Sequence, residues 1–520
     1  MTPNIELIIA VFLLIVSITA VISMRLKVPY TVILVLIGSI TIATLTILSI
    51  QGGLLQGPAQ ALIDEIQLLY DQLVSGGSGS LFVGLIVPPL LFEAMIHIRP
   101  DDLKSVIRPS LVLATIGVII ATIVCGLVLW LGLGLSPYVS FIFAALIAPT
   151  DVVTVLEVFR RVKVPSKLAT LLQCEAAFND ATAIFILTIF VSIAGLQIVT
   201  PMDAISSFGF TLGVGALIGI VVAFLGELLS SLFVDGVVET ILAIVVVYGS
   251  YALATAVEAS GLVAVAVAGL YYGRYTMRTA LVHKERESVK IFWQIIAFIG
   301  NTIAFLLIGF QANLLAFPQS LLLIVAAFIA VTLGRATVVY PILAVFKKKL
   351  GEKSSIIWSN ISMLGGVRGA ISIALAATIG VTAALTSEDV TLIHTLVFGV
   401  AFISIMFQVP ILLHYAKRKL AKTDSARTTE LNRNFGYIER AIAETKKLKA
   451  EGKLSAEQYE EKITEIRTEL YDIICKSAAS VPTKQIIQER ASALFASLPK
   501  IPVNSRAKKI RKSDRKEESD

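Results

Sequence analysis

Charged residues are scarce in this chain of 520 residues: 16% are Asp, Glu, Lys or Arg, whereas 56% are hydrophobic. Soluble proteins contain about a quarter charged residues. A mean hydropathy of +0.84 is also too high for a chain that encloses its apolar side chains in one water-soluble core. This composition excludes a soluble globular protein and predicts that lipid surrounds most of the chain.

Cysteine and histidine are rare, with three and four residues respectively. Cys125, Cys174 and Cys475 are scattered, without the spacing of a zinc site or of a disulfide framework. A nucleotide-binding phosphate loop is also missing, because the glycine-rich stretch "GGSGS" at 76–80 lacks the Gly-Lys-Ser/Thr that binds phosphate. The sequence therefore predicts no cofactor and no site for a soft metal.

Basic residues outnumber acidic ones, which gives a formal net charge of +7. In a soluble protein this excess would suggest a nucleic-acid partner. Here the Lys and Arg residues fall in short loops between apolar runs and in the C-terminal tail, where membrane topology explains them. Membrane lipid, and not nucleic acid, is therefore the expected partner.

Apolar runs long enough to cross a bilayer recur along the chain. A span needs about 20 apolar residues at about 1.5 Å of rise each. This measure predicts an all-α polytopic membrane protein with about 13 transmembrane helices. The predicted spans are 5–23, 31–50, 81–98, 108–134, 138–158, 166–195, 207–234, 238–256, 260–273, 290–311, 319–345, 356–380 and 392–416.

Lys and Arg occur in alternate loops, which predicts the orientation of the spans. Basic residues follow the first, third, fifth, ninth, eleventh and thirteenth spans, whereas the loops between the other spans, such as 51–80 and 381–391, contain none. By the positive-inside rule, the N-terminus lies outside and the C-terminus is cytoplasmic. The acidic loop 235–239 does not fit this pattern. We expect a multi-pass protein of the cell membrane.

Several charged residues fall inside the predicted spans. A charge in lipid is costly and is retained mainly where it faces a cavity, a partner or a permeating ion. If each intramembrane base pairs with one acid, two carboxylates remain to be neutralised by a proton or a metal cation. The charged residues singled out within the spans are the acids Glu93, Asp151, Glu175 and Asp180 and the bases Arg335 and Arg368.

Backbone breaks are predicted in the fifth and twelfth spans. Pro149 cannot donate to a helix and should unwind the turn at Thr150 and Asp151. The glycines of "SMLGGVRGAIS" make a similar weak point in the twelfth span. Paired interrupted helices mark the binding site in many transporters. The fifth and twelfth spans are seven spans apart, which is the offset expected if spans 1–6 and spans 8–13 are inverted repeats.

Helical spacing assigns faces within the sixth span. Glu175 and Asn179 are four residues apart and share one face, so both can engage a structural partner. Asp180 lies about 100° further round the helix, where it can face Asp151 on the unwound turn of the fifth span. Two carboxylates and free backbone carbonyls form a hard-oxygen site suited to Na⁺.

Four motifs occur in order on these spans: "APTDVV", "FNDATAI", "VEASGLVAVAVAGL" and "GGVRGAISIALA". In combination they resemble the monovalent cation/proton antiporter family, specifically its sodium/proton exchanger branch with the Asn-Asp motif, over residues 5–416. The resemblance implies a homodimer with a rigid dimerisation part and a mobile core bundle. It also implies exchange of a cation for protons by an elevator-like movement.

The resemblance assigns roles to individual residues. Asp180 looks like the aspartate that carries the ion and the proton, and Asp151 with Thr150 looks like the ligand pair on the unwound helix. Glu93 resembles an acid near the ion path and is counted with these three as a cation-binding residue.

Three further features complete the comparison. Glu175 looks like the partner of Arg368 in a structural ion pair. Position 176 is Ala where related exchangers often have a serine that binds the ion, and "TDVV" replaces the more usual Thr-Asp-Pro. The loss of the hydroxyl bears on which cation is preferred.

The predicted mechanism is competition at one carboxyl group. A carboxyl in a partly desolvated cavity holds either a proton or a cation, but not both. If each form crosses only when neutral, the chain is a secondary transporter and not an enzyme. Because Asn179 carries no proton, we expect one proton per cation.

Three alternatives are weighed against Na⁺/H⁺ exchange. K⁺/H⁺ exchange is not separated from it by the sequence. A cation channel would line its pore with acids or carbonyls, and Arg335 and Arg368 argue against it. An intramembrane aspartyl protease would need a Gly-x-Gly-Asp motif beside a span, and the sequence has none.

The chain changes character after Lys419, which divides it into a transmembrane domain (1–418) and a cytoplasmic tail (419–520). Two amphipathic stripes, Leu431 to Ile442 and Tyr459 to Ile473, predict a helical hairpin separated by Gly452. The tail either regulates transport or supports the dimer, or it simply packs on itself. The basic end is expected to be disordered and to touch anionic lipid.

Overall fold

Helices make up almost all of the described structure. In this computed structural model the described residues are 16–51 except 20, 24 and 27, together with 56–70, 72, 82–98, 100–162, 164–230, 236–276, 283–311, 317–350, 356–452, 454–477 and 494. Within these ranges the β structure is limited to one isolated bridge between Thr382 and Leu385. The prediction of an all-α protein is confirmed.

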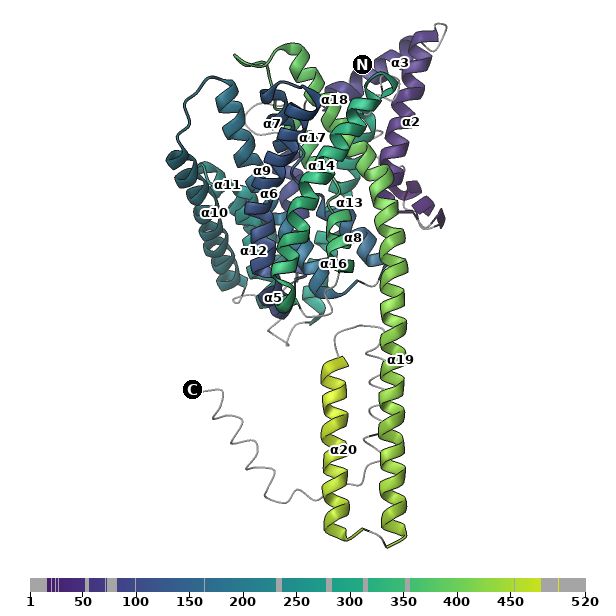
Figure 1. The fold of residues 1–520 in the computed structure, drawn as a ribbon. Helices are drawn as coiled ribbons and strands as arrows, with labels where there is room; N and C mark the ends of the chain where they lie inside the picture. The colour runs from purple at the N-terminus through teal and green to yellow at the C-terminus, as the bar shows by residue number, and fades with distance from the viewer. Residues whose placement is uncertain are drawn as a thin grey trace. The chain divides into compact units, whose positions relative to one another are not determined.

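The chain forms two compact units, Met1–Lys417 and Arg418–Asp520. Its α-helices, many of which are labelled in Figure 1, are α2 (Tyr30–Gln51), α3 (Gln56–Tyr70), α4 (Val87–Ile96), α5 (Pro100–Val112), α6 (Val118–Leu127), α7 (Pro137–Leu146), α8 (Val152–Arg161), α9 (Ser166–Ala194), α10 (Pro201–Ser230), α11 (Gly236–Ala256), α12 (Gly261–Thr276), α13 (His283–Gln311), α14 (Phe317–Val345), α15 (Lys347–Leu350), α16 (Ile356–Leu364), α17 (Ala370–Ala376), α18 (Ser387–Ile403), α19 (Val409–Ala450) and α20 (Ala456–Ser477).

The long apolar helices match the predicted spans closely. Among the described residues, eight continuous helical stretches are long and apolar enough to cross a membrane, and three shorter apolar helices accompany them. The predicted span 5–23 lies largely outside the described residues. Short π-helical segments interrupt some spans: η2 (Phe82–Ile86), η3 (Leu113–Gly117), η4 (Val128–Gly132) and η5 (Ser404–Gln408).

The fifth predicted span is broken, as the sequence indicates. Helix α7 ends at Leu146 and α8 begins at Val152, so residues 147–151 form a non-helical segment around Pro149. Ser136 caps the start of α7 by accepting a hydrogen bond from the backbone of Val139. The break falls where proline removes a helix donor.

The twelfth predicted span is broken in the same way, between α16 and α17. Residues 365–369, which include three glycines, are non-helical. The backbone N–H of Asp151 donates to the carbonyl oxygen of Val367 at 2.7 Å, so the two non-helical segments touch. The prediction of two interrupted, crossing helices is confirmed, whereas the inverted repeat stays a prediction.

Small residues allow close packing between helices in unit 1. A Cβ added to Gly219 of α10 would lie 2.2 Å from the carbonyl oxygen of Ala264 on α12. Gly38 of α2 and Gly309 of α13 meet similarly, because a Cβ on Gly38 would lie 2.8 Å from the Cα of Gly309. Packing through small residues is typical of helices in lipid, where van der Waals contact drives association.

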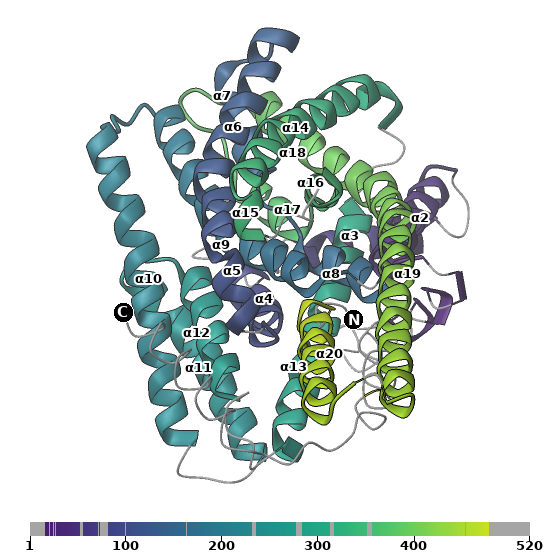
Figure 2. The same cartoon turned by 60° about the horizontal axis from the view of Figure 1, so that its bottom comes forward.

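Helices α10, α11 and α12 lie together along one side of unit 1 (Figures 1 and 2). Helix α10 exposes many large apolar side chains along its length, among them Leu217, Phe224 and Leu228. An apolar helix face of this kind requires lipid or another protein surface to cover it.

Unit 2 contains the predicted helical hairpin. Helix α19, which begins in unit 1, ends at Ala450, and Gly452 has a φ of +69°, a conformation that glycine adopts easily. Ser455 and Gln458 exchange hydrogen bonds as a capping box at the start of α20. Ile438 of α19 and Ile463 of α20 are buried, and the side chains at 421–435 lie outside the described part.

Candidate functional site

A cavity with about 550 Å³ of empty space lies where the two broken helices cross. Asp151 and Thr150 come from the first break, Gly369 from the second, and Asp180 from the middle of α9. The structure therefore brings together three of the residues that the sequence assigns to cation binding. The cavity is lined by Phe82, Val87, Leu90, Leu91, Pro149, Thr150, Asp151, Val153, Asp180, Asn301, Ala304, Phe305, Gly369, Ile371 and Ser372.

Asp180 has an oxygen atom without a protein partner. Its side chain is 3% exposed, and its Oδ1 atom is buried and accepts no hydrogen bond within the described structure. Leaving a buried carboxylate oxygen unpaired is costly. A proton on the carboxyl group or a cation beside it would relieve that cost.

The neighbouring Asn179 is also oriented toward the unwound turn. Its Nδ2 donates to the Thr150 hydroxyl at 2.6 Å, and its Oδ1 has no partner in the described part of the chain. The sequence placed Asn179 with Glu175 on a face for structural partners, but Asn179 does not share the partner of Glu175. Its amide instead fixes Thr150 beside Asp180.

Asp151 is held by its own helix. It is the N-cap of α8: one carboxylate oxygen accepts from the backbone N–H of Val153 at 3.0 Å, and the other accepts from the Thr154 hydroxyl. The cap fixes the position of the carboxylate at the edge of the cavity. Carboxylate oxygens keep further lone pairs after these bonds, so Asp151 can still contact a cation.

These groups suit a weakly held monovalent cation, which would be a substrate and not a resident metal. The donor set consists of carboxylate, hydroxyl and amide oxygens, as hard cations prefer. Across the described ranges, no cluster of three or more His, Cys, Asp or Glu side chains is arranged to hold a metal ion. Two carboxylates with neutral oxygens provide less charge than a tight divalent site requires.

Glu93 lies in a neighbouring cavity, not in the one that contains Asp180. Its Oε1 is 3.1 Å from Nη2 of Arg160 and 3.8 Å from Nδ1 of His97. This second cavity has about 450 Å³ of empty space and shares Val153 and Asn301 with the first. Glu93 is therefore an acid near the cation cavity, and the structure does not group it with the other three predicted cation-binding residues.

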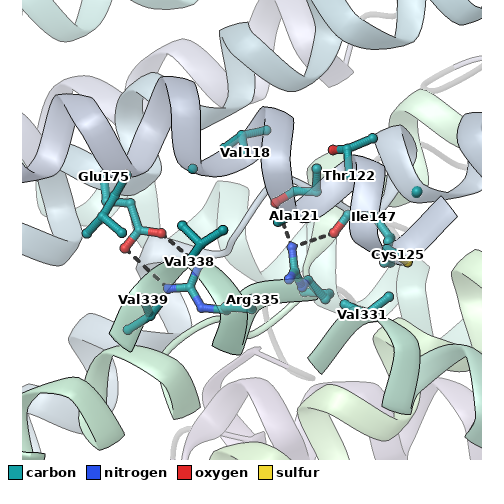
Figure 3. A pocket seen from close by; sticks show the side chains of 15 residues that line it. Val118, Ala121, Thr122, Cys125, Ile147, Glu175, Val331, Arg335, Val338 and Val339 are labelled. Carbon is teal, nitrogen blue, oxygen red and sulfur yellow. Dashed lines mark hydrogen bonds and ion pairs between the residues drawn. The ribbon is translucent and has the colours of Figure 1, made fainter. Parts of the chain in front are cut away.

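The predicted ion pair between Glu175 and Arg368 is wrong. Glu175 instead binds Arg335 through two contacts, Nη1 to Oε1 at 2.7 Å and Nη2 to Oε2 at 3.2 Å (Figure 3). Arg335 also donates to the carbonyl oxygen of Ser362 at the end of α16. The pair thus joins α9 and α14 to the second broken helix.

Arg368 has a different role from the one expected. Its Nη1 donates to the carbonyl oxygens of Ile147, Ala148 and Pro149, at 2.5, 2.6 and 3.3 Å. These carbonyls lack helical partners because the helix is broken there. Arg368 therefore stabilises the unwound segment that presents Thr150 and Asp151.

A further buried acid, Glu157, is missing from the sequence-based set. It accepts hydrogen bonds from the backbone N–H of Tyr30 at 2.6 Å and from Nη2 of Arg161 at 3.1 Å. Its position near the predicted end of a span hides it, because acids at span ends are ordinary.

Two polar residues of η5 complete the second break. The Ser404 hydroxyl accepts from the backbone N–H of Arg368 at 3.1 Å, and Gln408 Nε2 donates to the carbonyl of Leu364 at 2.7 Å. Both backbone groups are left without helical partners by the break. The sequence gives no local signal for these contacts, because they join residues 36 and 44 positions apart.

Residues 10–415 match the family described as "Sodium/hydrogen exchanger, transmembrane". The chain belongs to this family. Its members are secondary transporters and not enzymes, which agrees with the expectation from the sequence.

Two relatives support this assignment, and a solved structure shares the fold. The chain is 31% identical to the low-affinity Na(+)/H(+) antiporter NhaS1 of Synechocystis over 74% of this chain and 68% of that protein. It is 33% identical to the Na(+)/H(+) antiporter ApNhaP of Aphanothece halophytica over 64% of this chain, and the match covers 63% of that relative's length. The fold is similar to the sodium proton antiporter MjNhaP1 of Methanocaldococcus jannaschii, with a TM-score of 0.59 and 23% identity over 79% of this chain and 96% of that one.

Proposed function

We propose that this protein exchanges Na⁺ for H⁺ across a membrane, with both ions competing for Asp180. The observation that carries the proposal is the buried, unpartnered Oδ1 of Asp180 in a cavity shared with Asp151 and Thr150. A carboxyl group in this setting is neutralised by a proton or by a cation, and each excludes the other.

Exchange follows from this exclusion if the site opens to one side of the membrane at a time. A bare carboxylate at this depth is costly to move, so the site changes sides when a proton or a cation occupies it. Asp151 and Thr150 are the further oxygen ligands, and Asn179 positions the Thr150 hydroxyl. Movement of a core bundle against a fixed part would provide the alternating access.

Na⁺ is the preferred substrate over K⁺ in this proposal. Several relatives are named as Na(+)/H(+) antiporters, including NhaG of Bacillus atrophaeus, which is 28% identical over 68% of this chain. The oxygen ligands suit either ion, and Ala176 provides no hydroxyl group one turn before Asp180. The names of the relatives therefore support Na⁺ over K⁺.

Orientation and assembly are part of the same proposal. The alternating Lys and Arg of the loops support an external N-terminus and a cytoplasmic C-terminus in the cell membrane. The exposed apolar side chains of α10 support a homodimer that covers this face. Unit 2 would then be cytoplasmic and available for regulation.

Proteoliposomes with an imposed proton gradient and an internal pH dye test the exchange. Addition of Na⁺ should dissipate the gradient in the unaltered protein, whereas Asp180→Asn should abolish this flux and remain folded, because Asn neither carries a proton nor provides a charge. Asp64→Asn is the matched control, since Asp64 is exposed on α3. Full exchange in Asp180→Asn would refute the role of Asp180.

A further inference from the structure

A third cavity is lined in part by Ile147 and Ala148 of the unwound segment 147–151. It has about 430 Å³ of empty space, and Arg335, Arg368, Glu175 and Ile147 contribute to its wall. Neither arginine lines the cavity of Asp180, and neither Asp151 nor Asp180 lines this one. The two cavities are therefore chemically distinct.

One end of this cavity is fully paired. Figure 3 shows Glu175 and Arg335 facing each other, and their two contacts use both carboxylate oxygens. The Nε of Arg335 donates to the carbonyl oxygen of Ser362 at 3.3 Å. This end therefore has no strong donor left for another group.

The other end holds a positive charge without a carboxylate partner. No Asp or Glu within the described ranges forms an ion pair with Arg368, which is 5% exposed. Its Nη1 contacts neutral carbonyl oxygens, and its Nε is buried without a hydrogen-bond partner. A buried charge compensated by dipoles alone is costly in a membrane protein.

A second unpartnered donor lines the same cavity. The Thr122 hydroxyl is buried and makes no hydrogen bond to any described residue, and the side chain is 1% exposed. In Figure 3, Thr122, Cys125 and Ile147 lie on the side of the pocket opposite Glu175. Arg368, Thr122 and the Cys125 thiol thus provide N–H, O–H and S–H donors to one cavity.

We propose that this cavity binds a small monovalent anion of the size of chloride, between the Arg368 guanidinium and the Thr122 hydroxyl. The charges in the cavity wall favour an anion, because Arg335 and Arg368 are opposed by Glu175 alone. Water could satisfy the unpartnered donors but would leave the charge of Arg368 uncompensated.

The anion would act on the exchanger through Arg368. This residue holds the carbonyls of 147–149, directly before Thr150 and Asp151. A bound anion would compensate the charge of Arg368 and so stabilise the conformation in which Arg368 holds these carbonyl groups. The site is separate from the cation cavity, so this inference goes beyond the exchange reaction and can fail independently of it.

Thermal unfolding of the purified full-length protein tests the site. Sodium is held constant while gluconate, a much larger and polyhydroxylated anion, is replaced by chloride or bromide. The midpoint should rise by a few degrees with the small anions and should continue to rise with their concentration, as expected for a ligand that binds the folded state. Equal midpoints in gluconate and in the halides would overturn the proposal.

Two variants separate this site from a general salt effect. Thr122→Val removes the hydroxyl while retaining the shape of the side chain, so the difference between bromide and gluconate should disappear. Thr115→Val is the control, because Thr115 bonds its own helix and does not line the cavity; it should keep the difference. A difference retained in Thr122→Val would overturn the proposal.

If Thr122→Val fails to fold, a measurement on the unaltered protein tests the anion site instead. Crystals grown in bromide are measured for anomalous scattering at the bromine absorption edge. A peak beside the Arg368 guanidinium supports the site, and no peak there at saturating bromide overturns it.

Discussion

Asp151 and Gly369 are in direct contact where the two broken helices cross. A Cβ built on Gly369 would lie 2.6 Å from the Cβ of Asp151 and 2.9 Å from its carboxylate carbon. Real carbon atoms do not approach so closely, so a glycine at 369 is required for this crossing. The contact makes the second break a part of the cation cavity, since it sets where the Asp151 carboxylate lies.

Gly369→Ala should therefore reduce exchange far more than it reduces folding. The added methyl group must displace Asp151 or the α17 backbone, and a displacement of about 1 Å in a site can cost roughly 100-fold in rate. Gly380→Ala is the matched control, because nothing lies within 4 Å of a Cβ at that glycine. Proteoliposome flux at saturating Na⁺ measures both, and an unchanged rate in Gly369→Ala would show that the contact is unimportant.

Glu175 and Arg335 should be energetically coupled. Removing either partner of a buried ion pair leaves an uncompensated charge and costs about 3–5 kcal/mol. We expect Glu175→Ala and Arg335→Ala each to lower thermal stability strongly, and the double variant to lose much less than the sum of the two.

A second double-mutant cycle, in which Arg368 takes the place of Arg335, provides the control for this pair. Glu175→Ala combined with Arg368→Ala should be closer to additive, because Arg368 binds carbonyl oxygens and makes no ion pair with Glu175. Stronger coupling of Glu175 to Arg368 than to Arg335 would restore the pairing that the sequence suggested.

Local signals explain which features could be predicted from the sequence. Apolar runs fix the spans, and Pro149 and Gly369 mark the breaks, because each effect depends on a few adjacent residues. The meeting of Asp151 and Asp180 could also be predicted, since they lie near the middle of two consecutive spans that pack against each other. These features required no knowledge of how distant helices meet.

Partner choice depends on packing between distant segments and could not be predicted. Glu175 had two intramembrane arginines available, and the orientation of α14 decides for Arg335. Glu157 is buried because Tyr30, 127 positions earlier, donates to it. Asn179 contacts Thr150 because the break in the fifth span brings that hydroxyl toward α9, which spacing within α9 alone cannot indicate.

The apparent KM for Na⁺ should rise as the pH falls. If a proton and Na⁺ compete for Asp180, each pH unit below the titration midpoint of its carboxyl group should raise the KM about tenfold. The reason is that the fraction of unprotonated sites, which Na⁺ can bind, falls about tenfold with each such unit. The maximal rate at saturating Na⁺ should change little over the same range.

Initial rates of flux measured over a series of Na⁺ concentrations at several pH values check this competition. Li⁺ provides a comparison, since it should show the same pH dependence with a different KM. A maximal rate that falls with pH while the KM stays constant would mean that protons act at another site.

Exchange should be electroneutral, with one proton for each cation. Asp180 is the acid of the cavity with an unpartnered oxygen, whereas both carboxylate oxygens of Asp151 accept hydrogen bonds, from Val153 and Thr154. We therefore expect Asp151 to keep one charge state through the cycle. Asn179 contributes an amide and no proton. Replacing H⁺ by Na⁺ at Asp180 then leaves the charge of the moving part unchanged.

A membrane potential should therefore do no net work on the cycle, although it would act with about 2.3 kcal/mol per 100 mV on any net charge moved. The test finds the Na⁺ gradient that just balances a fixed proton gradient, first at zero potential and then with the potential clamped by valinomycin and K⁺. Glu93 and Glu157, which bind Arg160 and Arg161, are the acids that could add a second proton. A balance point that moves with the potential would mean that one of them, or Asp151, also cycles its proton, and that the stoichiometry is not one to one.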